Sequence, residues 1–150
     1  MKDNIKFVGI YFHKNEDLYF EPGSIVDGAW GTHGPVMAYR AEMLDAIRFV
    51  QVLRCALSFS KSGISEEELD KIYGSGVLPS KGKGAFTKKS HYLSCRLEDG
   101  VLTFSSTKQD GRGGFEYGFD IYTVPENASN IEIYATYQKA MRRSIELDTL

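Results

Sequence analysis

The residues around an Asp-Gly pair at positions 99–100 constrain the fold more than any other part of the sequence. Asp-Gly is a favoured two-residue turn between antiparallel strands, and apolar and polar residues alternate on both sides of it. If this pair forms the turn, Leu97 faces Leu102 and Cys95 faces Phe104 on one side of the hairpin. Because both strands then agree on which face is apolar, the sequence predicts an antiparallel β-hairpin with this register.

Three further segments predict strands. Ile5–Phe12 has apolar residues at both odd and even positions, which is typical of a central strand covered on both faces. Leu18–Phe20 is expected to form a short return strand. In Phe115–Val124, the alternate residues Phe115 to Ile121 should face the core. The stretch Glu21–Arg40 is rich in Gly and Pro, and we expect an ordered surface loop there.

Two segments predict long helices. Ala41–Ser60 is apolar around most of its circumference, so it should lie buried in the core. Ser129 and Glu132 form a capping-box pattern at the start of the second helix, which should run to about Leu147. A third, shorter helix is indicated by the capping-box pattern Ser65–Glu68. The expected buried stripe of the last helix comprises Ile131, Tyr134, Tyr137, Met141 and Ile145.

Together these elements predict a single α+β domain over residues 1–150, with a mostly antiparallel sheet of four to five strands packed against two main helices. The chain has 150 residues, 42% of them hydrophobic and 25% charged, which is typical of a globular protein that buries a core. No apolar run approaches the ~20 residues that span a bilayer, and the start lacks the apolar run of a signal peptide. We therefore expect a cytoplasmic protein with no membrane contact.

The three histidines and two cysteines show no spacing of a known catalytic or metal site. His91 and Cys95 share one face of the predicted hairpin, but Leu93 and Leu97 share it too, so a buried free cysteine is the better interpretation. No C-x-x-C, H-E-x-x-H or G-x-S-x-G pattern occurs. We therefore predict a protein that is not an enzyme and that holds no metal and no cofactor.

Charged residues are unevenly distributed along the chain. Residues 79–97 contain five Lys or Arg and no acid, whereas acidic residues gather between positions 16 and 45 and again between positions 66 and 70. Such segregation steers charged partners, although the net charge of −2 disfavours a nucleic-acid binder. Trp30 lies in the expected loop, where it is either a contact residue for a partner or an anchor that holds the loop on the core.

The later two thirds of the chain resemble a known family. The stretch from Ser94, SCRLEDGVLTFSSTKQDGRGGFE, precedes a strand and then VPENASNIEIYATYQKAMRRS. These segments resemble bacterial immunity proteins of contact-dependent growth-inhibition systems. In that family, a helix ending in A-L-S-x-S resembles Ala56–Ser60, and a closing helix that ends in a basic pair and Ser resembles Val124–Ser144.

The resemblance implies an inhibitor in the cytoplasm that binds the C-terminal toxin domain of a cognate effector, often a nuclease, and neutralises it. The resemblance identifies no binding residue in this chain, because the contact surfaces of such proteins differ between toxin–immunity pairs. A nuclease is expected to be basic because it binds phosphates. From the clustering of acidic residues in this chain, we expect that its carboxylates and an aromatic side chain bind the nuclease. The expected toxin interface comprises Glu16, Asp17, Glu21, Asp27 and Trp30, with Glu66, Glu67 and Asp70 as a second group.

Other functions remain open on the sequence alone. The basic loop 81–89 could bind nucleic acid through Lys81, Lys83, Lys88 and Lys89. A small enzyme could use His91 or His33 with nearby carboxylates. A structural subunit of a larger complex would expose a large apolar patch to a constant partner. The sequence does not indicate an oligomeric state.

Overall fold

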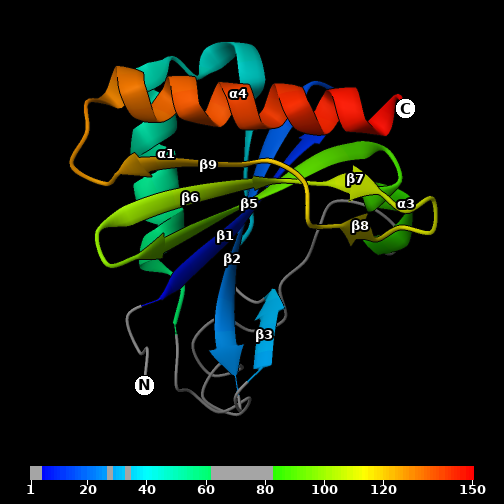
Figure 1. Cartoon of the computed structure of the whole chain (residues 1–150), viewed down its shortest axis with the longest axis horizontal. Coiled ribbons are helices and arrows are strands. Elements are labelled where there is room, and N and C mark those ends of the chain that lie inside the picture. The colour runs from blue at the N-terminus through cyan, green and yellow to red at the C-terminus, as the bar shows by residue number, and fades with distance from the viewer. Residues whose placement is uncertain (1–4, 27–28, 33–34, 62–82) are drawn as a thin grey trace.

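The computed structural model describes residues 5–26, 29–32, 35–61 and 83–150, with side chains outside 25–34 and 83–84. Within these ranges the chain forms a seven-stranded antiparallel sheet, a second sheet of two strands, and two main helices (Figure 1). The strands are β1 (Lys6–His13), β2 (Asp17–Val26), β3 (Ala29–Thr32), β4 (Met37–Arg40), β5 (Ser90–Glu98), β6 (Val101–Ser106), β7 (Lys108–Gln109), β8 (Phe115–Glu116) and β9 (Ile121–Pro125). The helices are the 3-10 turn η1 (Ala41–Met43), α1 (Ala46–Ser58), the short α3 (Lys83–Thr87) and α4 (Asn130–Asp148).

The predicted α+β class is confirmed, and the sheet has more strands than expected. The order is β3-β2-β1-β5-β6-β9, and β4 pairs with β2 on the same edge as β3. Residues 21–40, predicted as a loop, instead complete β2 and supply β3 and β4. β4 pairs with Asp17–Phe20 and β3 with Gly23–Val26. Pro22 lies between these two stretches and pairs with no residue of β3 or β4. A strand tolerates proline at such a position, because the missing N–H is not needed for pairing.

The predicted hairpin is confirmed in its register. Leu97 pairs with Leu102 and Cys95 pairs with Phe104 between β5 and β6. Asp99 and Gly100 both have a positive φ, of 52° and 76°, which is the backbone of the turn that best joins twisted antiparallel strands. β1 pairs with both β2 and β5, so the first strand is central as predicted.

The strand predicted over residues 115–124 is broken, and the predicted buried face is wrong. Gly118 has a φ of +97° and lies between β8 and β9, so the alternation does not continue through it. Tyr117 and Ile121 are 53% and 63% exposed, and Phe119 is 36% exposed. In β9 the even-numbered positions face the core, with Val124 opposite Leu102.

The first main helix starts later than predicted, whereas the second starts at its predicted capping box. α1 begins at Ala46, because the side chain of Asp45 accepts a hydrogen bond from the backbone N–H of Arg48 and caps the helix. The capping box of α4 is confirmed, since Ser129 Oγ accepts from the N–H of Glu132. The predicted buried stripe is wrong at Ile131, which is 74% exposed while Ile133 is fully buried.

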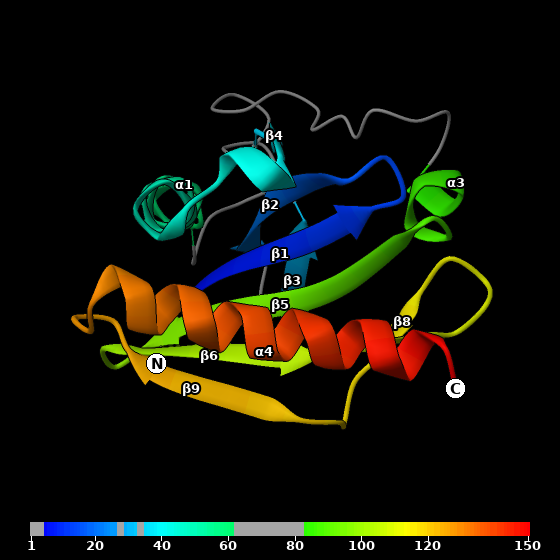
Figure 2. The ribbon, with the colours of Figure 1, turned by 90° about the horizontal axis from the view of Figure 1, so that it is seen from above.

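Both main helices pack on one face of the sheet. α4 lies along β5, β6 and β9, α1 lies over β1 and β2, and the two helices contact each other (Figure 2). The small side chains Ala140 and Ser144 are fully buried and let α4 approach the end of β6 closely. There, the Ser106 hydroxyl donates to the carbonyl of Ala140 (2.8 Å), and the backbone N–H of Thr107 donates to Ser144 Oγ (3.1 Å). The main apolar core therefore lies between the sheet and this helical layer.

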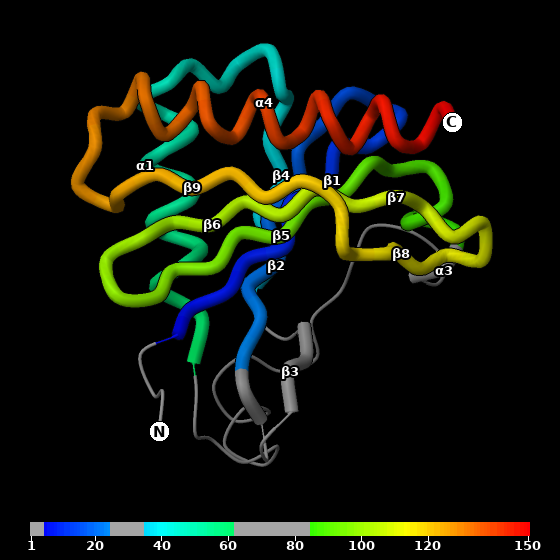
Figure 3. Tube along the Cα trace, viewed as in Figure 1, coloured from blue at the N-terminus to red at the C-terminus, as the bar shows by residue number. Residues whose placement is uncertain are grey.

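The opposite face of the sheet carries a separate aromatic cluster of Tyr11, Tyr19, Phe86 and Tyr92. Phe86 belongs to α3, and Phe115 of β8 packs against the same cluster. Figure 3 shows how the chain leaves β6, forms the small β7–β8 sheet beside α3, and returns as β9. None of the helices in the described part of the chain is long and apolar enough to cross a membrane.

Candidate functional site

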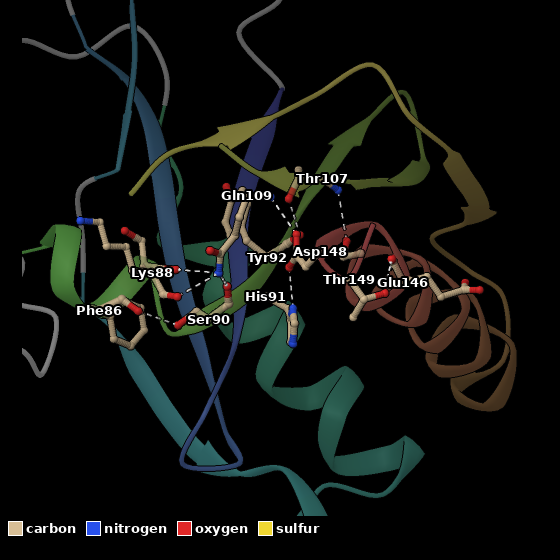
Figure 4. Close-up of polar contacts among 12 residues, drawn as sticks. Phe86, Lys88, Ser90, His91, Tyr92, Thr107, Gln109, Glu146, Asp148 and Thr149 are labelled. Atoms are coloured by element: carbon tan, nitrogen blue, oxygen red, sulfur yellow. Dashed lines mark hydrogen bonds and ion pairs between the residues drawn. The ribbon is translucent and has the colours of Figure 1, made fainter. Parts of the chain in front are cut away.

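A buried carboxylate organises the end of α4. The side chain of Asp148 is 6% exposed, and its Oδ2 lies 2.5 Å from Nδ1 of His91 on β5 (Figure 4). Its Oδ1 accepts a hydrogen bond from the backbone N–H of Gln109 on β7 (2.7 Å). Because an ionised carboxylate can only accept, His91 donates through Nδ1 and keeps Nε2 for other contacts. One side chain thus fastens the end of α4 to two strands.

Gln109 extends this network toward the start of β5. Its side-chain Nε2 donates to the carbonyl oxygens of Thr87, Lys88 and Ser90. The segment that joins α3 to β5 is therefore held in place by the same residue whose backbone binds Asp148 (Figure 4). This network borders an open depression of about 520 Å³. The depression is lined by Phe12, His13, Lys14, Glu16, Lys88, Lys89, Ser90, His91 and Gln109.

Two of the predicted interface acids lie together at the turn between β1 and β2. Glu16 is exposed and Asp17 is half-buried. Arg40 of β4 makes an ion pair with Asp17 (3.6 Å) and another with Glu42 of η1 (3.7 Å). Glu16, Asp17 and Glu42 form what we call the acidic corner. It carries three carboxylates against the single guanidinium of Arg40.

Glu21 lies away from this corner and is only 5% exposed. Its carboxylate accepts a hydrogen bond from the hydroxyl of Tyr11 (3.1 Å) within the aromatic cluster. Burial, followed by the charge of Glu21, raises the pKa of Tyr11 well above its usual range, so that hydroxyl stays protonated and donates. Glu21 therefore has a structural role in this fold, and its side chain is not on the surface.

The other predicted interface residues are not placed by the structure. Trp30 belongs to β3 and pairs with Ile25, and its side chain lies outside the described residues. Asp27, Glu66, Glu67 and Asp70 also lie outside them, as does the helix predicted at residues 65–68. The same holds for His33 and Lys81, and for the side chain of Lys83.

An exposed apolar patch next to the acidic corner was missed at the sequence level. Tyr39, Met43 and Ile47 are 42%, 59% and 57% exposed, and we call them the apolar patch. Tyr39 and Met43 border a depression of about 430 Å³ between β4 and α1. Ile47 is exposed although the sequence predicts it to be buried, because the predicted helix starts at Ala41, five residues too early, and is apolar around most of its circumference. The detectable signal was Asp45, a good N-cap residue that places Met43 before the helix.

A His–Cys nucleophile is not supported by the geometry. Cys95 is fully buried, and burial raises the pKa of its thiol far above the usual range, so the reactive thiolate is disfavoured. His91 pairs with Asp148 instead. In the part of the chain that the structure describes, no group of three or more His, Cys, Asp or Glu side chains could hold a metal ion.

Comparison with known proteins shows a shared fold without detectable sequence relatives. No family model matches the sequence, and no curated protein matches it either. A protein of unknown function from Neisseria meningitidis has a TM-score of 0.73 at 15% identity, covering 95% of this chain and 97% of the other. A chain of the CdiA-CT/CdiI toxin and immunity complex from Yersinia pseudotuberculosis has a TM-score of 0.72 at 13% identity, covering 95% and 99%. The chain therefore has the fold of a component of a toxin–immunity complex.

Proposed function

We propose that this protein is an immunity protein of a contact-dependent growth-inhibition system. It binds the C-terminal toxin domain of a cognate effector, which we propose to be a nuclease, and neutralises it in the cytoplasm. The observation that carries the proposal is the end-to-end fold similarity to a chain of a toxin and immunity complex, with 95% and 99% of the two chains covered. The hairpin and the capped last helix, whose motifs resemble those of immunity proteins, agree with this assignment.

The surface best suited to such a partner combines the acidic corner and the apolar patch. Protein interfaces typically place large apolar side chains at the centre and charged groups at the rim. Here Tyr39 and Met43 border one depression and Arg40 and Glu42 border another, and Glu42 directly precedes Met43 in η1, so a short stretch of chain supplies both groups. The apolar side chains would supply most of the binding free energy, as buried Tyr and Met anchors do in other interfaces.

The charged groups of this surface would contribute mainly to the rate of association. A nuclease carries basic groups around the groove that holds phosphates, and carboxylates attract that surface at long range. Glu16 makes no ion pair among the described residues, so it is available to a cationic partner. The predicted contributions of Asp27, Trp30, Glu66, Glu67 and Asp70 stay part of this proposal.

Cells that express the toxin domain test the function directly. The candidate toxin is the C-terminal domain of a cognate effector, to be sought among large surface proteins encoded near this gene. Its induction should stop growth, and co-expression of this chain should restore growth, whereas an unrelated immunity protein should not. Purified chain added to the toxin domain should abolish nuclease activity at equimolar amounts. Failure to protect cells, with both proteins present in soluble form, would exclude the proposed function.

A further inference from the structure

The depression bordered by His91 has an excess of free positive charge. The side chains of Lys14, Lys88 and Lys89 are exposed and line it, and none of them makes an ion pair within the described residues. Glu16 is the only carboxylate in its lining. The whole protein carries a net charge of −2, so this local reversal of sign is not a general property of the surface.

The backbone segments that carry these lysines are fixed to each other by hydrogen bonds. Lys14 follows β1, and its backbone N–H donates to the carbonyl of Lys89 (2.8 Å), which joins the two sides of the depression. Gln109 binds the carbonyl of Lys88 and so fixes the backbone of the opposite side. The lysine side chains extend from two fixed backbone segments, which lowers the entropic cost of bringing them to one ligand.

His91 adds an oriented hydrogen-bonding group to the same depression. Asp148 accepts from its Nδ1, and the side chain of His91 is 31% exposed where it lines the depression. Because Nδ1 is engaged by Asp148, Nε2 is the ring nitrogen left to hydrogen-bond a ligand. No described residue hydrogen-bonds to Nε2.

We propose that this depression is a binding site for a phosphate group. A phosphate has more negative charge than a carboxylate and four oxygens that accept in different directions, which suits lysines that arrive from both sides of the depression, with the imidazole of His91 beside them. The volume of about 520 Å³ exceeds what one phosphate needs and falls in the range of ~300–1,000 Å³ that small-molecule sites have. A phosphate ester such as a mononucleotide therefore fits the site better than the bare ion does. The proposal does not rest on the proposed toxin-binding function.

The test is a titration of the full chain at constant ionic strength with four ligands. These are inorganic phosphate, a mononucleotide, a short single-stranded oligonucleotide and, as an anion without phosphate, a glutamate-rich peptide. Ring nitrogen resonances of His91 report binding by NMR, and calorimetry gives the dissociation constant. The variant Lys88→Ala/Lys89→Ala should weaken binding of every phosphate ligand at least tenfold. The variant His91→Gln should weaken it as well. The matched control is Lys139→Ala, an exposed lysine of α4 outside the depression, which should leave affinity unchanged.

The relative affinities identify the source of the phosphate. Stronger binding of the mononucleotide than of the oligonucleotide assigns the site to a small phosphate ester, and the reverse assigns it to a nucleic-acid strand. Three results would overturn the proposal. These are the absence of any shift at His91, equal affinity in the double variant and the control, and tighter binding of a glutamate-rich peptide than of every phosphate ligand.

Discussion

His91 and Asp148 connect the middle of the sheet to the last residue of α4. The imidazole Nδ1 and the carboxylate Oδ2 lie 2.5 Å apart although the residues are 57 positions apart in sequence. The same carboxylate accepts from the backbone of Gln109, so it has two donors and is 6% exposed. A single buried acid thus joins α4, β5 and β7, and the depression proposed to bind phosphate lies beside this junction.

The substitution Asp148→Ala should destabilise the fold by about 1–3 kcal/mol, because it leaves the N–H of Gln109 and Nδ1 of His91 without a buried acceptor. Chemical denaturation followed by circular dichroism measures the change. The matched control is Asp120→Ala. That residue pairs with Arg143 at 2.6 Å on the surface, with side chains 51% and 34% exposed, and its loss should cost less than about 1 kcal/mol. Equal costs for the two variants would contradict the structural role assigned to Asp148.

The substitution Gly9→Ala should destabilise the protein by about 1–3 kcal/mol through a steric clash. A Cβ at position 9 would lie 2.8 Å from Cε1 and 2.9 Å from the hydroxyl of Tyr92, closer than real contacts allow. The ring of Tyr92 is buried against Tyr11 and Phe115, so it cannot easily move away. In a Tyr92→Leu background the alanine should cost clearly less. An unchanged cost in that double-mutant cycle would show that the clash is not the cause.

Asp110 should make the stability of the β7–β8 sheet depend on pH. Its carboxylate accepts from the backbone N–H groups of Arg112 (2.7 Å) and Gly114 (3.0 Å), and these bonds lower its pKa in the folded protein. Because the folded pKa is below the unfolded one, the stabilisation is complete above the ordinary aspartate pKa. It is lost as the pH falls through the lower folded value.

Unfolding of the wild type and of Asp110→Ala, compared from about pH 6 to about pH 2, measures this contribution. The gap in free energy of unfolding between the two proteins should be constant at the upper end and should close at the lower end. A gap that is the same at every pH would mean that the carboxylate makes no charge-dependent contribution.

Reversing the charge of the acidic corner should weaken toxin binding mainly through slower association. The triple variant Glu16→Lys/Asp17→Lys/Glu42→Lys would repel a basic toxin domain and should reduce the association rate constant about tenfold or more at low salt. Surface plasmon resonance measures the rates, and added salt should shrink the difference. The control Glu146→Lys reverses an exposed acid near the end of α4. If the triple variant and the control associate equally fast, the contact face lies elsewhere.

Local signals in the sequence predicted local structure well. The Asp-Gly turn and the alternation on both sides determined the β5–β6 register, because both strands of that hairpin lie within one short segment. The Ser129 cap likewise lies next to the N–H that it accepts from. The strands β3 and β4 were not predicted, for two reasons. They pair with residues of β2 that lie up to 23 positions away in the sequence, as Arg40 does with Asp17. In addition, the glycines and prolines of this stretch are typical of a loop.

The faces of elements were predicted less well than the elements themselves. A single backbone break at Gly118 reverses which residues of the following strand face the core, and composition does not reveal that break. Ile131 and Ile47 are apolar residues in first helical turns. Both are exposed because the first buried side chains, Ile133 and Phe49, lie two residues further along, on nearly the opposite side of each helix. The His91–Asp148 contact joins residues far apart in sequence, so spacing alone could not predict it.

The most direct test of the proposed function is a calorimetric titration of the purified chain with the toxin domain of its cognate effector. An immunity protein must bind its toxin tightly, so we predict one chain bound per toxin domain with a dissociation constant on the order of nanomolar or below. The absence of heat and of a complex in size-exclusion chromatography, with both proteins folded, would contradict it.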